Sequence, residues 1–157
     1  MWDRAGPWAG LVARLGLAGV WLYAGGTKVG DLAASGRAVN AYRIMPFEVA
    51  QVIGAMLPFV EIVVGLLLLA GLATRVSAAF SVLLLTVFIA GIASAWARGL
   101  QIDCGCFGSG GQLAAGENPT YGWEIARDLG FLILAGYLLI RPDSRFSADR
   151  AVQPAQV

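Results

Sequence analysis

The sequence contains no histidine, only two cysteines and few charged residues. Of its 157 residues, 11 are Lys or Arg and 10 are Asp or Glu, which gives a charged fraction of 13% and a formal net charge of +1. A tetrahedral zinc site needs four ligands, usually cysteine or histidine, and this chain alone offers too few. We therefore expect no metal site of that kind. We also expect no nucleic-acid partner.

Hydrophobic residues, in contrast, make up 58% of the chain, and the mean hydropathy is +0.71. Such a composition lies outside the range of soluble globular proteins, and the length allows one domain. Residues 76–97 carry no charge and are numerous enough to cross a bilayer as a helix. Three further apolar stretches are predicted as membrane helices, over about 8–25, 51–73 and 121–140. The predicted fold is all-α: a polytopic membrane protein with a four-helix transmembrane bundle over residues 1–140, embedded in the lipid bilayer.

The predicted connections differ in length and polarity. Residues 27–45 form an interfacial loop, residues 99–119 form a glycine-rich loop that carries both cysteines, and residues 141–157 form a polar tail that we expect to be disordered. The distribution of arginines favours a plasma-membrane protein with both termini in the cytoplasm, and a cysteine pair is more useful as a disulfide outside the cytosol. The cysteine loop is therefore expected to be extracytoplasmic. The oligomeric state stays open, a homo-oligomer included.

The two cysteines, Cys104 and Cys106, are separated only by Gly105. A disulfide between them requires the chain to bend, because its Cα atoms must lie about 4.4–6.8 Å apart, and glycine bends at the least steric cost. The resulting small ring would be strained and would exchange readily, whereas a staple across so short a loop would constrain the unfolded chain little. This favours a redox pair. A structural disulfide, inert thiols and a Cu(I) site are the alternatives.

Four of the ionisable residues inside the predicted helices are singled out: Arg14, Glu61, Arg127 and Asp128. Charges there are costly and often mark a functional site. Pro58 either kinks a long helix or begins its span, and in the second case Glu61 lies near the same membrane face as Arg127 and Asp128. We expect Glu61 and Arg127 to pair beneath the cysteines, where the arginine would favour a thiolate and the carboxylate would carry a proton. The alternative is an ion pair that only fixes helix packing.

Several of these segments resemble a known family. The segments Tyr23-Ala-Gly-Gly-Thr-Lys28, with Asp31, and Leu57-Pro-Phe-Val-Glu61 resemble the first two helices of DoxX-like membrane proteins. Asp103-Cys-Gly-Cys-Phe-Gly108 and the Arg127-Asp128 pair resemble the MauE branch, the methylamine utilisation membrane proteins. The resemblance runs from about residue 11 to residue 140.

The resemblance implies a four-helix membrane bundle that supports oxidative maturation of extracytoplasmic proteins beside a thioredoxin-like partner. On this hypothesis the catalytic residues are Cys104 and Cys106, which cycle between dithiol and disulfide, with Glu61, Arg127 and Asp128 around them. Quinone is the candidate electron acceptor. Quinone-linked oxidants of this size normally use a second cysteine pair, which this chain lacks, so direct transfer from one pair, or no quinone at all, stays open. The alternatives are a non-enzymatic membrane subunit or assembly factor with a structural disulfide, and a Cu(I)-handling protein.

Overall fold

The structure is a computed structural model that describes residues 2–107 and 110–152. Its elements are α1 (Trp2–Lys28), α2 (Leu32–Ala41), α3 (Phe47–Ala70), α4 (Thr74–Ala97), β1 (Ile102–Asp103), β2 (Gly111–Gln112), α5 (Tyr121–Ile140) and α6 (Ala148–Val152). Four long helices dominate, and β1 and β2 form only a short antiparallel pair inside the cysteine loop. The predicted all-α class is therefore confirmed.

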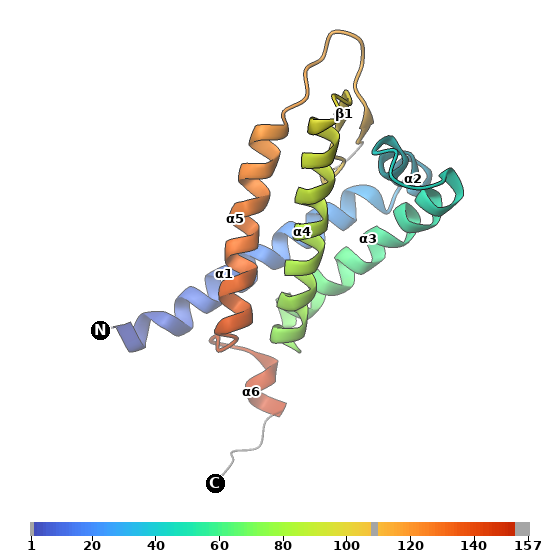
Figure 1. Cartoon of the computed structure of the whole chain (residues 1–157). Coiled ribbons are helices and arrows are strands. Elements are labelled where there is room, and N and C mark those ends of the chain that lie inside the picture. Colours follow the sequence, from blue (N-terminus) through green and yellow to red (C-terminus); the bar gives the residue numbers. More distant parts are fainter. Residues whose placement is uncertain (1, 108–109, 153–157) are drawn as a thin grey trace.

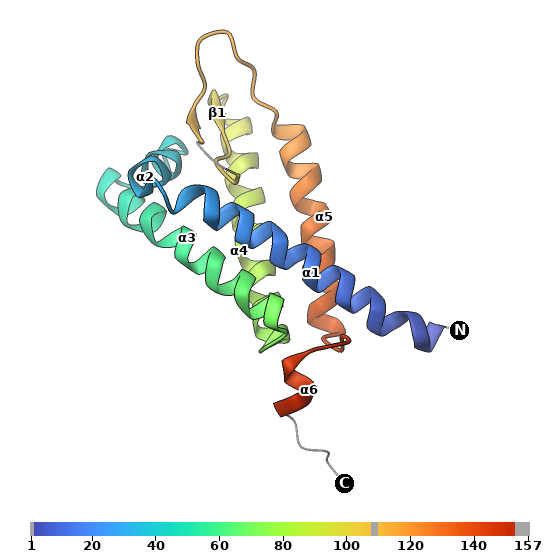
Figure 2. The same cartoon turned by 180° about the vertical axis from the view of Figure 1, so that it is seen from behind.

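The long helices form two pairs that are inclined to each other. α1 packs along α3, and α4 packs along α5, with α1 crossing behind the second pair (Figures 1 and 2). α2 lies over the first turns of α3. We call the end of the bundle that carries the cysteine loop the loop end, and the opposite end, where α5 runs into α6, the tail end.

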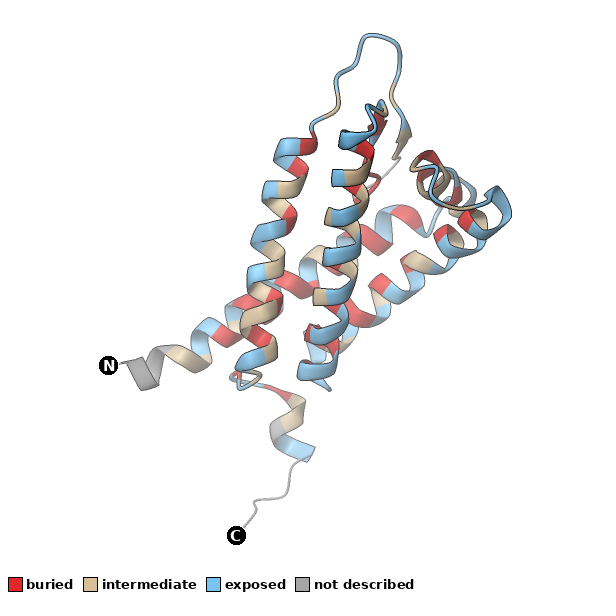
Figure 3. Cartoon of the chain, viewed as in Figure 1, coloured by how far each residue is buried: buried red, intermediate tan, exposed pale blue. Residues whose placement is uncertain are grey.

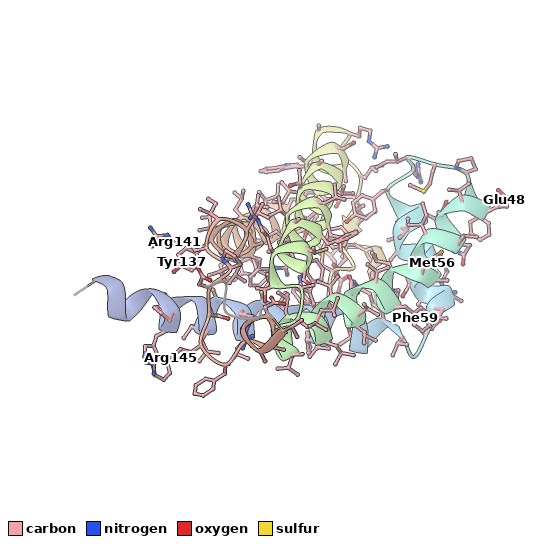
Figure 4. The ribbon with its side chains drawn as sticks, turned by 90° about the horizontal axis from the view of Figure 1, so that it is seen from below. Glu48, Met56, Phe59, Tyr137, Arg141 and Arg145 are labelled. Atoms are coloured by element: carbon pink, nitrogen blue, oxygen red, sulfur yellow. The ribbon has the colours of Figure 1, made fainter. Side chains whose placement is uncertain are left out.

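Three of the described helices are long and apolar enough to cross a membrane: Gly6–Lys28 within α1, Phe47–Ala70 and Thr74–Ala97. Exposed residues run along the outward faces of these helices (Figure 3), and many are large and apolar, such as Val63 at 54% exposure and Leu83 at 58%. Met56 and Phe59 point outward from α3 (Figure 4). Such faces suit contact with lipid. α5 matches the predicted bounds of the fourth span but carries three charges in its first turns, and its crossing stays a prediction.

Small residues bring the helices of the first pair together. A Cβ atom at Gly25 of α1 would lie 2.7 Å from the carbonyl oxygen of Pro58, and one at Gly65 of α3 would lie 2.8 Å from Cγ of Leu22. Glycine at such positions lets helix backbones approach closely in lipid. The α1–α3 contact therefore depends on positions where any larger side chain would push the helices apart.

The helices around residues 27–45 differ from the sequence prediction. α1 continues through Lys28, and the expected loop contains α2, whose first turn is capped by Asp31 accepting from the amide of Ala34 at 2.8 Å. α3 begins at Phe47 and runs through Pro58. Of the two interpretations of Pro58, the one in which it begins the span is wrong. An interior proline removes one backbone hydrogen bond, and the packing of α3 against α1 and α2 offsets that loss. Glu61 consequently lies in the middle of α3 and not in its first turn.

The tail also differs from the expected disorder over residues 141–152. Asp149 accepts hydrogen bonds from the amides of Ala73 and Thr74 at 2.7 and 2.9 Å, and Arg14 donates to the carbonyl of Phe146 at 3.2 Å. Arg145 lies beside α1 (Figure 4), with its guanidinium carbon 4.9 Å from the ring centre of Trp8. The amides at the start of α4 need acceptors, which Ala73 cannot supply from its own side chain, and a tail carboxylate supplies them. Residues 153–157 of the predicted tail lie outside the described part.

Candidate functional site

The cysteine loop is fixed to the bundle by two tyrosines. Tyr121, the first residue of α5, accepts a hydrogen bond from the amide of Ile102 at 3.2 Å and donates one to the carbonyl of Leu100. Tyr42, between α2 and α3, donates to the carbonyl of Cys104 at 2.9 Å. The loop is therefore held from two sides, and Cys104 occupies a defined place over the loop end.

The chain bends at Gly105, as the sequence predicts. Its φ angle is +68°, in the left-handed region that favours glycine. A Cβ atom at Gly105 would lie 3.0 Å from Cα of Gly110, and one at Gly110 would lie 1.9 Å from Cα of Gly105. Two glycines thus allow the two sides of the loop to touch. Gly108, part of the motif that carried the family resemblance, lies outside the described residues.

Cys104 and Cys106 are free thiols, and both are buried, with exposed fractions of 9% and 8%. The amide of Cys106 donates to Sγ of Cys104 at 3.2 Å, and Nη2 of Arg127 donates to the same sulfur at 3.8 Å. Hydrogen bonding from Cys106, with a further contribution from Arg127, lowers the pKa of Cys104 in spite of its burial. The pKa of Cys106 is raised, because its thiol donates to Cys104 and is itself buried. Cys104 is therefore the sulfur that ionises first.

Arg127 is held in place by two neighbours. Its Nε and Nη2 donate to Oδ1 of Asp128 at 3.0 and 2.9 Å, and its guanidinium carbon lies 4.4 Å from the ring centre of Phe107. Phe107 in turn lies against Tyr23 and Phe131, with ring centres 5.8 and 6.3 Å away. A cation stacked on an aromatic face and tied to a carboxylate has little freedom. Asp128 and Phe107 thus act as positioning residues for the arginine that faces the sulfur.

The expected pair between Glu61 and Arg127 is wrong. Oε1 of Glu61 lies 2.7 Å from Nζ of Lys28, and both side chains are buried. Lys28, predicted to lie in the interfacial loop, is the last residue of α1, and its ammonium reaches across to the middle of α3. Lys28 therefore neutralises the buried carboxylate of Glu61, which is the role that we expected for Arg127. Arg127 is left to pair with Asp128 and to face Cys104.

Two acidic residues near Cys104 were not singled out from the sequence. One ligand atom each of Asp103, Cys104 and Glu124 lies within 4.8 Å of the others. Glu124 is 5% exposed, and its Oε2 has no hydrogen-bond partner among the described residues. Glu124 lies three residues before Arg127, so both residues lie on one face of α5, and this spacing could have identified Glu124 from the sequence. Three donors of mixed type fall short of a tetrahedral metal site, whereas a carboxylate beside a thiol suits proton transfer.

A cavity of about 230 Å³ borders the two thiols. Its walls come from α2, α3 and α4, its roof from Cys104, Gly105 and Cys106, and its surface is almost wholly apolar. Lys28 also lines it, so the cation of the Lys28–Glu61 pair and the cysteines border the same cavity. Of the predicted site residues, the structure thus brings Arg127 to Cys104 directly and Asp128 only through Arg127, and it connects Glu61 to the pair only through Lys28 and this cavity.

The chain matches the model of the family described as "Methylamine utilisation protein MauE" over residues 6–141. Neither a curated protein nor a solved structure matches it. The match covers α1 to α5 with the cysteine loop, which is the whole of the site described above. The likeness of the first two helices to DoxX-like proteins stays a resemblance.

Proposed function

The chain belongs to the MauE family of methylamine utilisation membrane proteins, and from this premise we propose that it is a membrane thiol–disulfide oxidoreductase. It supports oxidative maturation of extracytoplasmic proteins, with Cys104 and Cys106 as its redox pair and a thioredoxin-like protein as its partner. In this proposal α5 is the fourth membrane span, both termini are cytoplasmic, and the cysteine loop faces the extracytoplasmic side.

The single observation that carries the proposal is the unequal environment of the two sulfurs. Cys104 receives hydrogen bonds from the amide of Cys106 and from Arg127, whereas Cys106 donates to Cys104. A structural disulfide has no need of a guanidinium aimed at one sulfur. In thiol–disulfide exchange, however, the sulfur with the lower pKa is the better leaving group.

The direction of exchange follows from this difference. A thiolate of the reduced partner attacks Sγ of Cys106 in the disulfide form, the bond between the two cysteines breaks, and Cys104 leaves as a thiolate stabilised by Arg127. The second thiol of the partner, after losing its proton, then attacks the mixed disulfide and expels Cys106, which takes up a proton. The partner is oxidised and the pair is reduced by two electrons. Glu124, beside Cys104, is placed to exchange the protons involved.

The test mixes the oxidised full-length protein with a reduced thioredoxin that keeps only its attacking cysteine. An acid quench preserves the mixed disulfide for peptide mapping. We expect thioredoxin attached to Cys106, with Cys104 free. The Cys104→Ser variant serves as the control, since it cannot form the internal disulfide and should accept thioredoxin only after separate activation of Cys106.

Other results would favour the alternatives. A pair that stays oxidised in a large excess of reduced thioredoxin contradicts the proposal and points to the membrane subunit or assembly factor with a structural disulfide. Tight binding of Cu(I) that disappears in Cys104→Ser, without any mixed disulfide in the wild type, would point to Cu(I) handling, because two thiolates suit this soft ion.

A further inference from the structure

We infer that the apolar cavity beside the cysteine pair binds the head group of a lipid-soluble quinone, which reoxidises Cys104 and Cys106. The inference rests on the proposed function, because a pair that has taken two electrons from its partner must pass them on. Within the described residues the cavity and the thiols share one surface, so an acceptor bound there needs no second cysteine pair to reach the sulfurs.

The size of the cavity suits a single substituted ring. A cavity of about 150 Å³ in another protein holds benzene, and this one has a volume of about 230 Å³. Its walls include Leu57 of α3 and Leu84 and Phe88 of α4, and its roof is the bend from Cys104 to Cys106. A flat ring with small substituents would fill this space and lie against the sulfurs.

The cavity opens toward the region that lipid occupies. Ile53 of α3 and Val87 of α4 line it and are 42% and 56% exposed, so the cavity is open at these side chains and not enclosed. α3 and α4 are joined at the tail end and diverge toward the loop end (Figure 1), and both helices contribute exposed lining residues to the cavity. An occupant with a long apolar tail can enter sideways and leave its tail in the bilayer.

One polar group distinguishes a quinone from a lipid acyl chain as the occupant. Lys28 is 5% exposed and lines the cavity, and an ammonium has three donor hydrogens, of which the described contacts assign one to Glu61 at 2.7 Å. A quinone carbonyl accepts such a hydrogen bond, and its oxygen becomes more basic as electrons arrive. A hydrocarbon chain would leave the remaining donors of a buried cation without a partner, which is unfavourable.

The transfer step balances with the groups present. Sγ of Cys104 and Sγ of Cys106 form a bond, and two electrons pass to the quinone ring. One quinone oxygen takes the proton of the Cys106 thiol. The other takes the proton that Cys104 gave up on ionising, returned through Glu124 or from water. The products are the disulfide and a quinol, and Lys28 stabilises the charge that develops on the nearer oxygen.

The test compares two neighbouring leucines of α4. Leu84 lines the cavity, whereas Leu83 is 58% exposed and does not line it. Leu84→Trp should fill the cavity, and Leu83→Trp adds the same bulk on the lipid-facing side. The reduced full-length protein in lipid nanodiscs is mixed, without oxygen, with a short-tailed benzoquinone, and quinol formation and thiol loss are followed together. We expect Leu84→Trp to slow both by about ten-fold or more and Leu83→Trp to leave them unchanged.

Exchange with thioredoxin, measured on the same preparations, separates the two proposals and reports on folding. Leu83→Trp should exchange at the wild-type rate, and Leu84→Trp should still exchange, which shows that it is folded. Equal quinone rates in Leu84→Trp and Leu83→Trp would overturn the cavity as the quinone site. A wild-type protein that exchanges with thioredoxin but is not oxidised by the benzoquinone would overturn the quinone as acceptor and leave the proposed function intact. A wild-type protein that does not exchange at all would overturn the proposed function itself.

Discussion

Replacement of Arg127 by methionine should impair the ionisation of Cys104 more than any other single change outside the cysteine pair. Methionine keeps much of the length and apolar contact with Phe107 but removes the charge and the hydrogen bond to Sγ. Cys104 would then keep only the amide and thiol of Cys106 as donors.

The size of the effect follows from the distance. Nη2 of Arg127 lies 3.8 Å from Sγ of Cys104, and two unit charges about 4 Å apart interact by about 4 kcal/mol at an effective dielectric constant of about 20. The arginine side chain is 21% exposed, so water screens part of this, and we expect a loss of about 2 kcal/mol. At neutral pH that corresponds to a roughly 30-fold smaller thiolate population.

The assay is the rate of alkylation of Cys104 by iodoacetamide as a function of pH, in a Cys106→Ser background where only one thiol reacts. Arg127→Met should shift the profile to higher pH, and Arg127→Lys should shift it less, because the charge remains while the rigid fork is lost. Arg37→Met, at an exposed arginine of α2, is the matched control. Superimposable profiles for Arg127→Met and the control, in proteins of equal helicity, would refute the assigned role of Arg127.

Three further changes have expected outcomes. Gly105→Ala should destabilise the loop by about 1–2 kcal/mol, because a Cβ atom is strained at φ +68° and also meets Gly110. Alkylation of the native protein should be faster than in the control Gly99→Ala, whose φ is +67° but whose Cβ atom would meet nothing within 4 Å. Equal rates would show that the close approach of Gly105 and Gly110 does not matter. Glu61→Gln should lower the free energy of unfolding in detergent by about 3–5 kcal/mol, because it leaves the Lys28 ammonium buried without its charged partner. The double variant Glu61→Gln/Lys28→Met should recover part of this loss. A double variant no more stable than Glu61→Gln would contradict the assigned ion pair. Partial burial alone would raise the pKa of Asp149, but hydrogen bonds from the amides of Thr74 and Ala73 hold this pKa below its ordinary value. The ionised carboxylate therefore stabilises the fold above about pH 4, and this stabilisation is lost as the pH falls through the lowered pKa. Thermal unfolding should show this acid-dependent loss in the wild type and not in Asp149→Asn.

The sequence was sufficient to predict the elements whose composition is decisive by itself. An uncharged apolar run predicted α4 to within two residues, and α5 begins and ends where it was predicted. The bend at Gly105 also followed from local chemistry, because a spacing of one residue between cysteines leaves few conformations that bring them close. These features depend on neighbours in the sequence and not on how the helices pack.

The features that the sequence did not predict depend on packing. Lys28 pairs with Glu61 only because α1 runs three residues past its expected end and crosses α3 at a glycine-lined contact. Which of several acidic residues faces Cys104 depends on the rotation of α5, and Glu124 was therefore overlooked. The tail offered no apolar pattern, and its attachment through Asp149 rests on two amides at the start of α4.

A redox titration of the two cysteines tests the central claim most directly. The full-length protein is equilibrated in buffers of graded glutathione or dithiothreitol potential, and its free thiols are counted with a mass tag. A redox pair predicts a two-electron transition with a midpoint between about −120 and −300 mV, the range of known exchange proteins, and its loss in Cys104→Ser and in Cys106→Ser. A pair that stays oxidised below this range, or thiols that form no disulfide at any potential, would contradict a redox function for Cys104 and Cys106.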